Sequence, residues 1–501
     1  MQRNGILLIF GLVIICALFS FFGIDRSPVT WVDEVFYAEP ARQMFLGGNL
    51  SSPIYFDVRD LDSKFFLHPP VHFFVQSLVF RLFGFSQFAV RIPPVLYYLI
   101  SILFIYFTIN QLLRQRSDSH IWALLGSAFF AFDNTIIAEA RSGRSGSFSI
   151  LLMLFSFYIL NKRDLNTYIA VFASTLVGGI ASLTHPASSF LIVGYFLNIL
   201  CNRSFNGFRL KLLIVFSIAL LICLVPYGLD VALNFSAWQN QFLAHTFAST
   251  GGLHDGKLQS LLRNFIDEFK LKPFALILIL ISMFSFNEKE FDSALLPLSG
   301  LILLAFTSTE SFYKFILPIA YINAFALLPF SKDRFFSNGI RRFALIALTA
   351  ASFINYTAFP SLRVFVIYSQ WELRDPSKVN KILEQYIPEK SKVLSIPLTY
   401  YASISRNIDF KYPSTLYGLR IKRTDQDLML FRSAVRNYKP NFLILDSAVN
   451  PVSEYGNLLT ASYNRLFRYR ADIKSNLNQG IVPVDFSIWE VQYAINSKGE
   501  K

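Results

Sequence analysis

Charged residues are scarce in this chain. Only 16% of its 501 residues are Asp, Glu, Lys or Arg, whereas 53% are hydrophobic and 54 are phenylalanine. Soluble domains carry about 25% charged residues, so this composition excludes a soluble protein of comparable length. It is typical of a protein whose chain crosses a membrane several times.

The sequence also lacks features of disulfide-rich, metal-binding and nucleic-acid-binding proteins. There are three cysteines, and all lie in or beside apolar segments, so neither a disulfide framework nor a cysteine-rich metal site is indicated. A divalent metal is left open, but no ligand spacing indicates one, and we expect that no cofactor is required. The net charge of +13 raises the question of nucleic acid, but most Lys and Arg before residue 359 lie in short loops between apolar runs. Membrane orientation explains that pattern, and we expect no nucleic-acid partner.

Apolar segments of roughly spanning length recur along the first 358 residues. We predict about 11 transmembrane helices, at 5–22, 88–113, 121–138, 147–160, 167–183, 186–201, 212–228, 273–286, 295–307, 312–330 and 343–358. No small-residue cleavage pattern follows residue 22, so the first segment is expected to remain as an uncleaved helix.

The run 71–83 needs separate treatment, because counting it as a span would reverse every later loop. As a helix it would rise only about 20 Å, against a hydrocarbon core of about 30 Å. It also contains His72, Gln76 and Arg81. We therefore predict a helix that lies in the membrane interface. With this choice the positive loops face the cytoplasm, the N-terminus is cytoplasmic and the C-terminal portion is outside.

Residues 359–501 differ in character from the membrane segments. Asp375-Pro376 marks a helix start, strands are predicted at 393–396, 442–445 and 484–491, and a helix at 426–438. The predicted fold is thus an α-helical polytopic protein of the cell membrane. It comprises a membrane domain at 1–358, with a first outer loop at 24–87 and a long outer loop at 229–272. A small extracytoplasmic α/β domain follows at 359–501.

Acidic residues occur where a membrane protein normally avoids them. Asp33 and Glu34 follow the first apolar segment, and an ionised carboxylate there can serve as a general base. Solvated loop acids are the alternative interpretation. Asp133 lies about five residues inside the outer end of its segment, where an ionisable side chain is costly and hence a functional candidate. It could equally be the buried structural partner of an arginine.

Several short motifs together resemble a known superfamily. Asp33-Glu34 and Tyr37 are followed by His68-Pro69-Pro70, by Arg91, and by Phe132-Asp133-Asn134 with Arg141. This combination is similar to the protein O-mannosyltransferase and aminoarabinose transferase superfamily of GT-C class glycosyltransferases. The resemblance is best from Trp31 to Arg144, and each motif alone is weak.

The resemblance implies an inverting transfer of a sugar from a polyprenyl-phosphate carrier to an acceptor hydroxyl on the outer face of the membrane. The acceptor could be a protein, a lipid or a polysaccharide. The catalytic candidates are Asp33, as the base, and Glu34, which would hold the loop. The substrate-binding candidates, several of them cations suited to the leaving lipid phosphate, are Tyr37, His68, Arg91, Asp133, Arg141, Arg144 and Lys314. Arg91 and Lys314 could instead snorkel to lipid headgroups, and His68 could simply fix a turn.

One departure from the superfamily pattern affects the mechanism. Related sequences commonly carry an aspartate a few residues after the arginine of the Asp-Asn cluster, but here residues 141–147 contain no acid. A mechanism that uses two acids is therefore in doubt. Two alternative functions remain at this point, namely a transporter or flippase for a lipid-linked sugar and a non-catalytic membrane scaffold. The absence of an internal repeat speaks against the transporter.

Overall fold

The computed structural model describes residues 2–28, 30, 32–55, 60–162, 164–202, 205–250, 295–300, 313–327, 359–372, 374–412, 433, 435, 437–446, 467–473, 478–479, 482–483 and 486–491. The chain forms two compact units, which are treated separately below. The helical unit comprises residues 1–22, 66–75 and 91–364, and the sheet unit comprises residues 23–65, 76–90 and 365–501.

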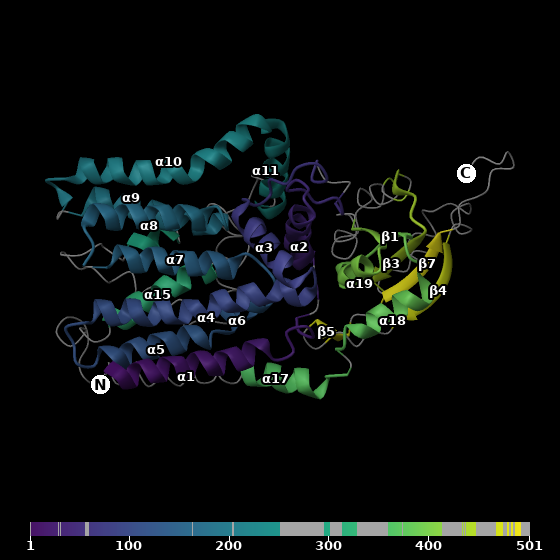
Figure 1. The fold of residues 1–501 in the computed structure, drawn as a ribbon, viewed down its shortest axis with the longest axis horizontal. Coiled ribbons are helices and arrows are strands. Elements are labelled where there is room, and N and C mark those ends of the chain that lie inside the picture. The colour runs from purple at the N-terminus through teal and green to yellow at the C-terminus, as the bar shows by residue number, and fades with distance from the viewer. Residues whose placement is uncertain are drawn as a thin grey trace. The chain divides into compact units, whose positions relative to one another are not determined.

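Most helices of the helical unit run side by side (Figure 1). Its helices, of which α3 and α4 extend into the sheet unit, are α1 (Gln2–Phe21), α3 (Val71–Phe83), α4 (Gln87–Leu112), α5 (Ser119–Ala131), α6 (Asn134–Arg141), α7 (Gly146–Leu160), α8 (Thr167–Ser182), the 3-10 helix η1 (Pro186–Ser189), α9 (Phe190–Cys201), α10 (Arg209–Leu233), α11 (Phe235–Thr250) and α15 (Tyr313–Leu327). Helix α8 packs between α7 and α10, and α5 packs against α1 and α15.

Within the described residues, α4 and α10 are long and apolar enough to cross a membrane. A third span is obtained if α5 and α6, which meet at a bend of 57°, count as one. Further apolar helices are shorter and include α1, α3, α7, α8 and α15. The helical membrane fold is confirmed, while the number of spans stays a prediction, because the predicted segments 273–286 and 343–358 lie outside the described residues.

Two of the predicted segments are interrupted in the structure. The segment 121–138 is split into α5 and α6, because Asp133 adopts an extended backbone conformation and caps α6. The segment 186–201 begins with η1, since the His185 side chain caps that short helix before α9 starts. The predicted helix at 71–83 is present as α3, and its place in the membrane interface stays a prediction.

The sheet unit is built on a five-stranded mixed sheet of order β2-β1-β3-β7-β4 (Figure 1). Its strands are β1 (Lys392–Leu394), β2 (Asp409–Lys411), β3 (Phe442–Asp446), β4 (Phe467–Ile473) and β7 (Phe486–Val491), and β5 (Asn478–Gln479) pairs separately with β6 (Val482–Pro483). Strand β1 runs parallel to β2 and β3, whereas β7 is antiparallel to β3 and β4.

Two helices complete the core of this sheet. Helix α18 (Ser377–Tyr386) and helix α19 (Tyr400–Ser405) contribute Leu383 and Ala402 to a cluster with Val393, Ile444 and Ile488. The Asp375 carboxylate accepts a hydrogen bond from the Ser377 N–H at 2.9 Å, as expected for an acid at a helix start. Most of the predicted helix 426–438 lies outside the described residues.

One element of the sheet unit was not predicted. Residues 24–87 were expected to form an outer loop, but α2 (Val32–Phe45) is a helix of 14 residues that contains Pro40. Asp33 and Glu34 occupy its first turn, where acids interact favourably with the helix dipole. The candidate catalytic acids are therefore placed on a helix rather than on a loop.

Candidate functional site

The two candidate catalytic acids differ in their surroundings on α2. Asp33 is half-buried, whereas Glu34 is completely buried. The Tyr401 hydroxyl, on α19, donates a hydrogen bond to Glu34 Oε1 at 3.0 Å. Glu34 is thus held within the sheet unit, which excludes a solvated loop acid at that position, and the more accessible Asp33 is the better placed of the two to meet a substrate.

A third acid of α2 was not singled out from the sequence. Glu39 is 1% exposed and accepts a hydrogen bond from the Tyr400 hydroxyl. Gln43 Nε2 donates to Glu39 Oε1 at 2.5 Å, and Arg42 Nη1 lies 3.4 Å from the same oxygen. In the sequence, Glu39, Arg42 and Gln43 stand at positions i, i+3 and i+4, which are neighbours on one face of a helix. This spacing could have indicated that Glu39 is paired. The two tyrosines of α19 therefore fix two buried acids of α2.

Two further tyrosines lie near these acids, one on α2 and one in the segment that follows it. Tyr37, a predicted substrate-binding residue, is buried, and its ring meets the Phe36 ring edge to face. Burial raises the pKa of the Tyr55 hydroxyl well above its usual value, and the nearby charges of Asp33 and Glu39 act in the same direction. A neutral phenol, that of Tyr55, therefore lies near Asp33.

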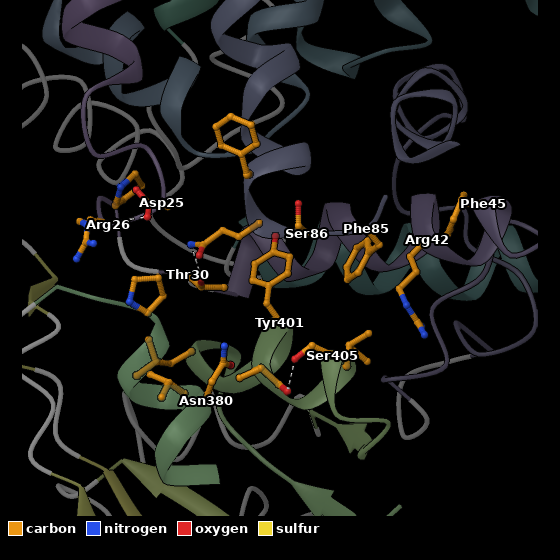
Figure 2. A pocket seen from close by; sticks show the side chains of 18 of the residues that line it. Asp25, Arg26, Thr30, Arg42, Phe45, Phe85, Ser86, Asn380, Tyr401 and Ser405 are labelled. Atoms are coloured by element: carbon orange, nitrogen blue, oxygen red, sulfur yellow. Dashed lines mark hydrogen bonds and ion pairs between the residues drawn. The ribbon is translucent and has the colours of Figure 1, made fainter. Parts of the chain in front are cut away.

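A pocket of about 520 Å³ lies within the sheet unit (Figure 2). Tyr401 and Phe85 form part of its wall, with ring centroids 5.7 Å apart, and the Arg42 guanidinium lies 5.6 Å from the Phe85 ring. Hydroxyl and amide side chains, among them Ser86 and Asn380, also line it. Volumes of this order are typical of ligand sites, which combine apolar walls with a few polar groups. Tyr401 lines this pocket and also binds Glu34, so it connects the pocket with the two candidate catalytic acids, Asp33 and Glu34.

In the helical unit, Asp133 sits at the break between α5 and α6. Its Oδ1 accepts hydrogen bonds from the N–H groups of Thr135 (2.7 Å) and Ile136 (3.3 Å). Its Oδ2 accepts from the Tyr321 hydroxyl of α15 at 2.9 Å. These contacts are those of a helix cap tied to a neighbouring helix. The predicted arginine partner is not among the hydrogen bonds that the structure gives Asp133, and its predicted substrate contact stays a prediction.

Arg141 ends the same short helix and is 1% exposed. Its guanidinium donates to the backbone carbonyls of Phe19, Ser20 and Phe22 at the C-terminal end of α1. A helix end leaves its last carbonyls without partners in the helix, and a cation satisfies both those oxygens and the helix dipole. Arg141 therefore joins α6 to α1.

A buried ion pair connects α6 with α15. Lys314 Nζ lies 2.7 Å from Glu139 Oε2, and both side chains are less than a tenth exposed. Lys314 is therefore not a side chain that snorkels to the membrane surface. The Arg144 charge also acts on Glu139, and the Gly146 N–H, at the start of α7, donates to its carboxylate. Glu139 was not among the predicted site residues, although it is the acid nearest in sequence to Arg141.

Two further predicted site residues, Arg91 and His68, lie in the helical unit. Arg91 is fully buried in α4, which excludes the snorkelling alternative for this residue. The His68 ring lies 5.7 Å from the His185 ring, which in turn lies 4.5 Å from Phe315. Among the described residues no group of three or more His, Cys, Asp or Glu side chains is arranged to hold a metal ion.

The predicted site residues thus fall into two groups. In the helical unit, the structure ties Asp133, Arg141 and Lys314 to α6 or its partners, with Arg144 close by. Arg91 and His68 belong to the same unit. Asp33, Glu34 and Tyr37 are grouped on α2 in the sheet unit.

Comparisons with known proteins agree with the membrane part of this chain. The family described as dolichyl-phosphate-mannose-protein mannosyltransferase matches residues 67–227. Arabinosyl transferases described as acting with undecaprenyl phosphate-alpha-4-amino-4-deoxy-L-arabinose match in Erwinia tasmaniensis, at 31% identity over 109 residues, and in Yersinia pestis, at 25% over 226 residues. These alignments cover 22% and 44% of this chain, and the chain spans only 19% and 39% of the two relatives.

Solved structures show the same fold over a larger part of the chain. ArnT from Cupriavidus metallidurans, bound to undecaprenyl phosphate, matches with a TM-score of 0.58 at 13% identity and covers 98% of both chains. The apo oligosaccharyltransferase of Archaeoglobus fulgidus matches with a TM-score of 0.54 at 11% identity, covering 87% of this chain and 69% of its own. The family match at residues 67–227 and the arabinosyl transferase relatives, together with this shared fold, confirm the resemblance of this chain to the mannosyltransferase and aminoarabinose transferase superfamily of GT-C glycosyltransferases.

Proposed function

We propose that this protein is an inverting glycosyltransferase that moves a sugar from a polyprenyl-phosphate carrier to an acceptor hydroxyl. The observation that carries the proposal is the acid pair of α2, in which buried Glu34 is fixed by Tyr401 and Asp33 remains accessible. The names of the relatives support a lipid-linked sugar donor. The fold shared with ArnT, whose structure holds undecaprenyl phosphate, agrees with it.

Asp33 is assigned as the general base. Its carboxylate takes the proton of the acceptor hydroxyl while the acceptor oxygen attacks the anomeric carbon. The bond from that carbon to the phosphate oxygen breaks, and the lipid phosphate leaves as an anion, so no general acid is needed. A single displacement inverts the anomeric configuration. General base catalysis of this kind contributes about 10² to 10⁴ in rate.

The leaving phosphate is assigned to cations of the helical unit. Lys314 and Arg144 are favoured, because Arg141 already satisfies the carbonyls at the end of α1. Arg91, which is fully buried in α4, is a further candidate. Preorganised cations stabilise charge that develops on a leaving group. No metal enters this scheme, and the expectation that none is required stays a prediction.

The pocket of the sheet unit is assigned to the acceptor. Tyr401 lines the pocket and also binds Glu34, which neighbours the proposed base. Its aromatic walls and Arg42 suit an amphipathic acceptor that presents a hydroxyl and carries a polar or anionic group. A lipid acceptor fits these features better than an extended polysaccharide.

The membrane arrangement belongs to the same proposal. About 11 helices span the cell membrane, the N-terminus is cytoplasmic, and residues 359–501 form an α/β domain outside. The sheet with α18 and α19 supports the assignment of an α/β domain.

The decisive experiment measures release of the free lipid phosphate by purified protein incubated with a panel of polyprenyl-phosphate sugars. We expect Asp33→Asn to fold normally and to lose about 10² to 10⁴ in rate. Asp62→Asn is the matched control, because Asp62 is an exposed acid later in the same region. Activity of Asp33→Asn equal to the wild type would refute the assignment of the base. Failure of the folded wild type to release lipid phosphate from any donor would instead favour a transporter or flippase.

A further inference from the structure

The Glu139 side chain fills the space that a Cβ atom at position 146 would need. Glycine, which has no Cβ, leaves this space open. A Cβ atom on Gly146 would lie 2.7 Å from the Glu139 Cδ and closer still to Oε1, which is too close for any real contact. The glycine therefore leaves room for a carboxylate that comes from the preceding helix. An acid thus lies beside the segment 141–147, which contains none of its own.

The same carboxylate is surrounded by positive groups. Lys314 Nζ is 2.7 Å from Oε2, the Arg144 charge acts on it, and the Gly146 N–H donates to it. An ammonium has three N–H donors, so pairing with one carboxylate oxygen is compatible with binding a second anion. Lysine is a point charge on a flexible stem, and its position is defined only by what holds it.

Stability alone does not account for this arrangement. A buried ion pair loses the hydration of both charges, and replacing it with apolar residues of similar volume is often neutral or stabilising. The Glu139–Lys314 pair is buried on both sides. The pair is therefore weak evidence for stability, and the placing of a cation is an alternative reason for burying two charges here.

We propose that Glu139 is a positioning residue that holds the Lys314 ammonium, together with Arg144, for the phosphate of the lipid-linked donor, and that Gly146 is required to admit its carboxylate. This inference rests on the proposed function, since Lys314 is assigned there to the phosphate. Glu139 itself touches no reacting atom.

The first test compares donor kinetics. Glu139→Gln keeps the shape of the side chain and removes its charge, and we expect kcat/KM for the donor to fall about 10- to 100-fold, the range found for residues that orient the ligands of a metal ion. The loss should appear mainly in KM for the donor, with KM for the acceptor unchanged. Asp164→Asn is the matched control, because Asp164 is an acid of the same unit whose side chain is 82% exposed. Donor kinetics of the wild type in folded Glu139→Gln overturn the proposal.

The second test moves the carboxylate from position 139 to position 146. In Glu139→Ala/Gly146→Asp the new acid occupies the space vacated by Glu139, and we expect it to restore donor kcat/KM to within about tenfold of the wild type, whereas Glu139→Ala alone stays about 100-fold lower. A double variant no better than Glu139→Ala overturns the proposal. Gly146→Ala should impair donor use because its Cβ displaces the carboxylate, whereas Gly11→Ala meets no atom within 4 Å and serves as its control.

A third variant separates positioning from folding. Glu139→Leu/Lys314→Met replaces the pair with apolar side chains, and we expect a folded protein that lacks donor use. A folded and fully active double variant overturns the proposal.

Direct binding of undecaprenyl phosphate separates this proposal from the proposed function, because it requires no turnover. If the wild type binds the lipid phosphate about tenfold more tightly than Glu139→Gln, as the loss of one charged partner predicts, the role of Glu139 stands even where no transfer is found. If the wild type and Glu139→Gln bind the lipid phosphate equally and both transfer the sugar, the glycosyltransferase assignment stands. The positioning role of Glu139 is then refuted.

Discussion

At the scale of single residues, the chain buries acids and satisfies each with a partner far away in the sequence. Glu34 and Glu39 of α2 receive hydroxyl hydrogen bonds from Tyr401 and Tyr400, more than 360 positions later. An unpaired buried carboxylate would be strongly destabilising. These pairs therefore fix α2 against α19, and the accessible Asp33 is held in place by its buried neighbour.

Tyr400→Phe tests this arrangement through stability. Because Glu39 loses a donor while remaining buried, we expect a loss of about 1 to 3 kcal/mol in the free energy of unfolding. Tyr368→Phe is the control, since the Tyr368 side chain is 72% exposed. Thermal unfolding in detergent at pH 7 measures both, and equal stability of the two variants would contradict the role assigned to Tyr400.

The same residue predicts a dependence on alkaline pH. Burial, and then the charge of Glu39, raise the pKa of the Tyr400 hydroxyl well above its usual value, which is about 10 in an unfolded chain. A raised pKa means that the folded state holds the proton more tightly, so its contribution to stability is complete below about pH 10 and falls as the pH rises further. Unfolding followed from pH 8 to 11 should show a steeper loss in the wild type than in Tyr400→Phe. Parallel curves would contradict this coupling.

At the scale of secondary structure, the sequence predicts those elements whose boundaries follow from apolar runs. Helices α4, α7 and α8 begin and end within one or two residues of the predicted segments. The break between α5 and α6 was missed because one aspartate inside an apolar run is compatible with a continuous helix. The hydrogen bonds that the Asp133 carboxylate accepts from the Tyr321 hydroxyl and from the Thr135 N–H can be seen only in the structure.

The candidate site could be predicted from the sequence only as a set of residues, whose roles stay predictions. Motif positions made Asp33 and Asp133 candidates, and Lys314 was a candidate because a cation suits the leaving lipid phosphate; rare polar residues stand out in an apolar sequence. Glu139 escaped notice, since its importance depends on Lys314 coming from α15 and on the absent side chain of Gly146. Contacts between residues distant in the chain cannot be read from local composition.

Asp133 allows a test at the scale of the helix. Asp133→Ala removes the cap of α6 and the acceptor for Tyr321, and we expect it to cost about 0.5 to 2 kcal/mol for the cap alone. Asp133→Asn keeps an oxygen that can accept from the Thr135 N–H, so most of that stability should remain. Thermal unfolding and transfer activity are measured on both variants. Full activity in Asp133→Asn would assign Asp133 to structure, and a folded but inactive protein would return it to the substrate-binding residues.

At the scale of the whole molecule, the sidedness of every loop depends on whether α3 crosses the membrane. This helix has 13 residues and would rise only about 20 Å, which is short of a hydrocarbon core of about 30 Å. If it lies in the interface, Asp62 before it and Arg81 near its end face the same side. If it crosses, they face opposite sides, and the C-terminal segment moves to the cytoplasm.

Thiol labelling of intact cells distinguishes these arrangements. Cys201 is exposed while Cys16 and Cys223 are buried, so Cys201→Ser provides a background with little native reactivity. Into it we would introduce Asp62→Cys, Arg81→Cys or Asp164→Cys, each at an exposed position. A reagent that cannot cross membranes should label positions 62 and 81 in intact cells and position 164 only after the cells are opened. Labelling of position 81 only in opened cells would show that α3 crosses the membrane, and the predicted sidedness of every later loop would then be reversed.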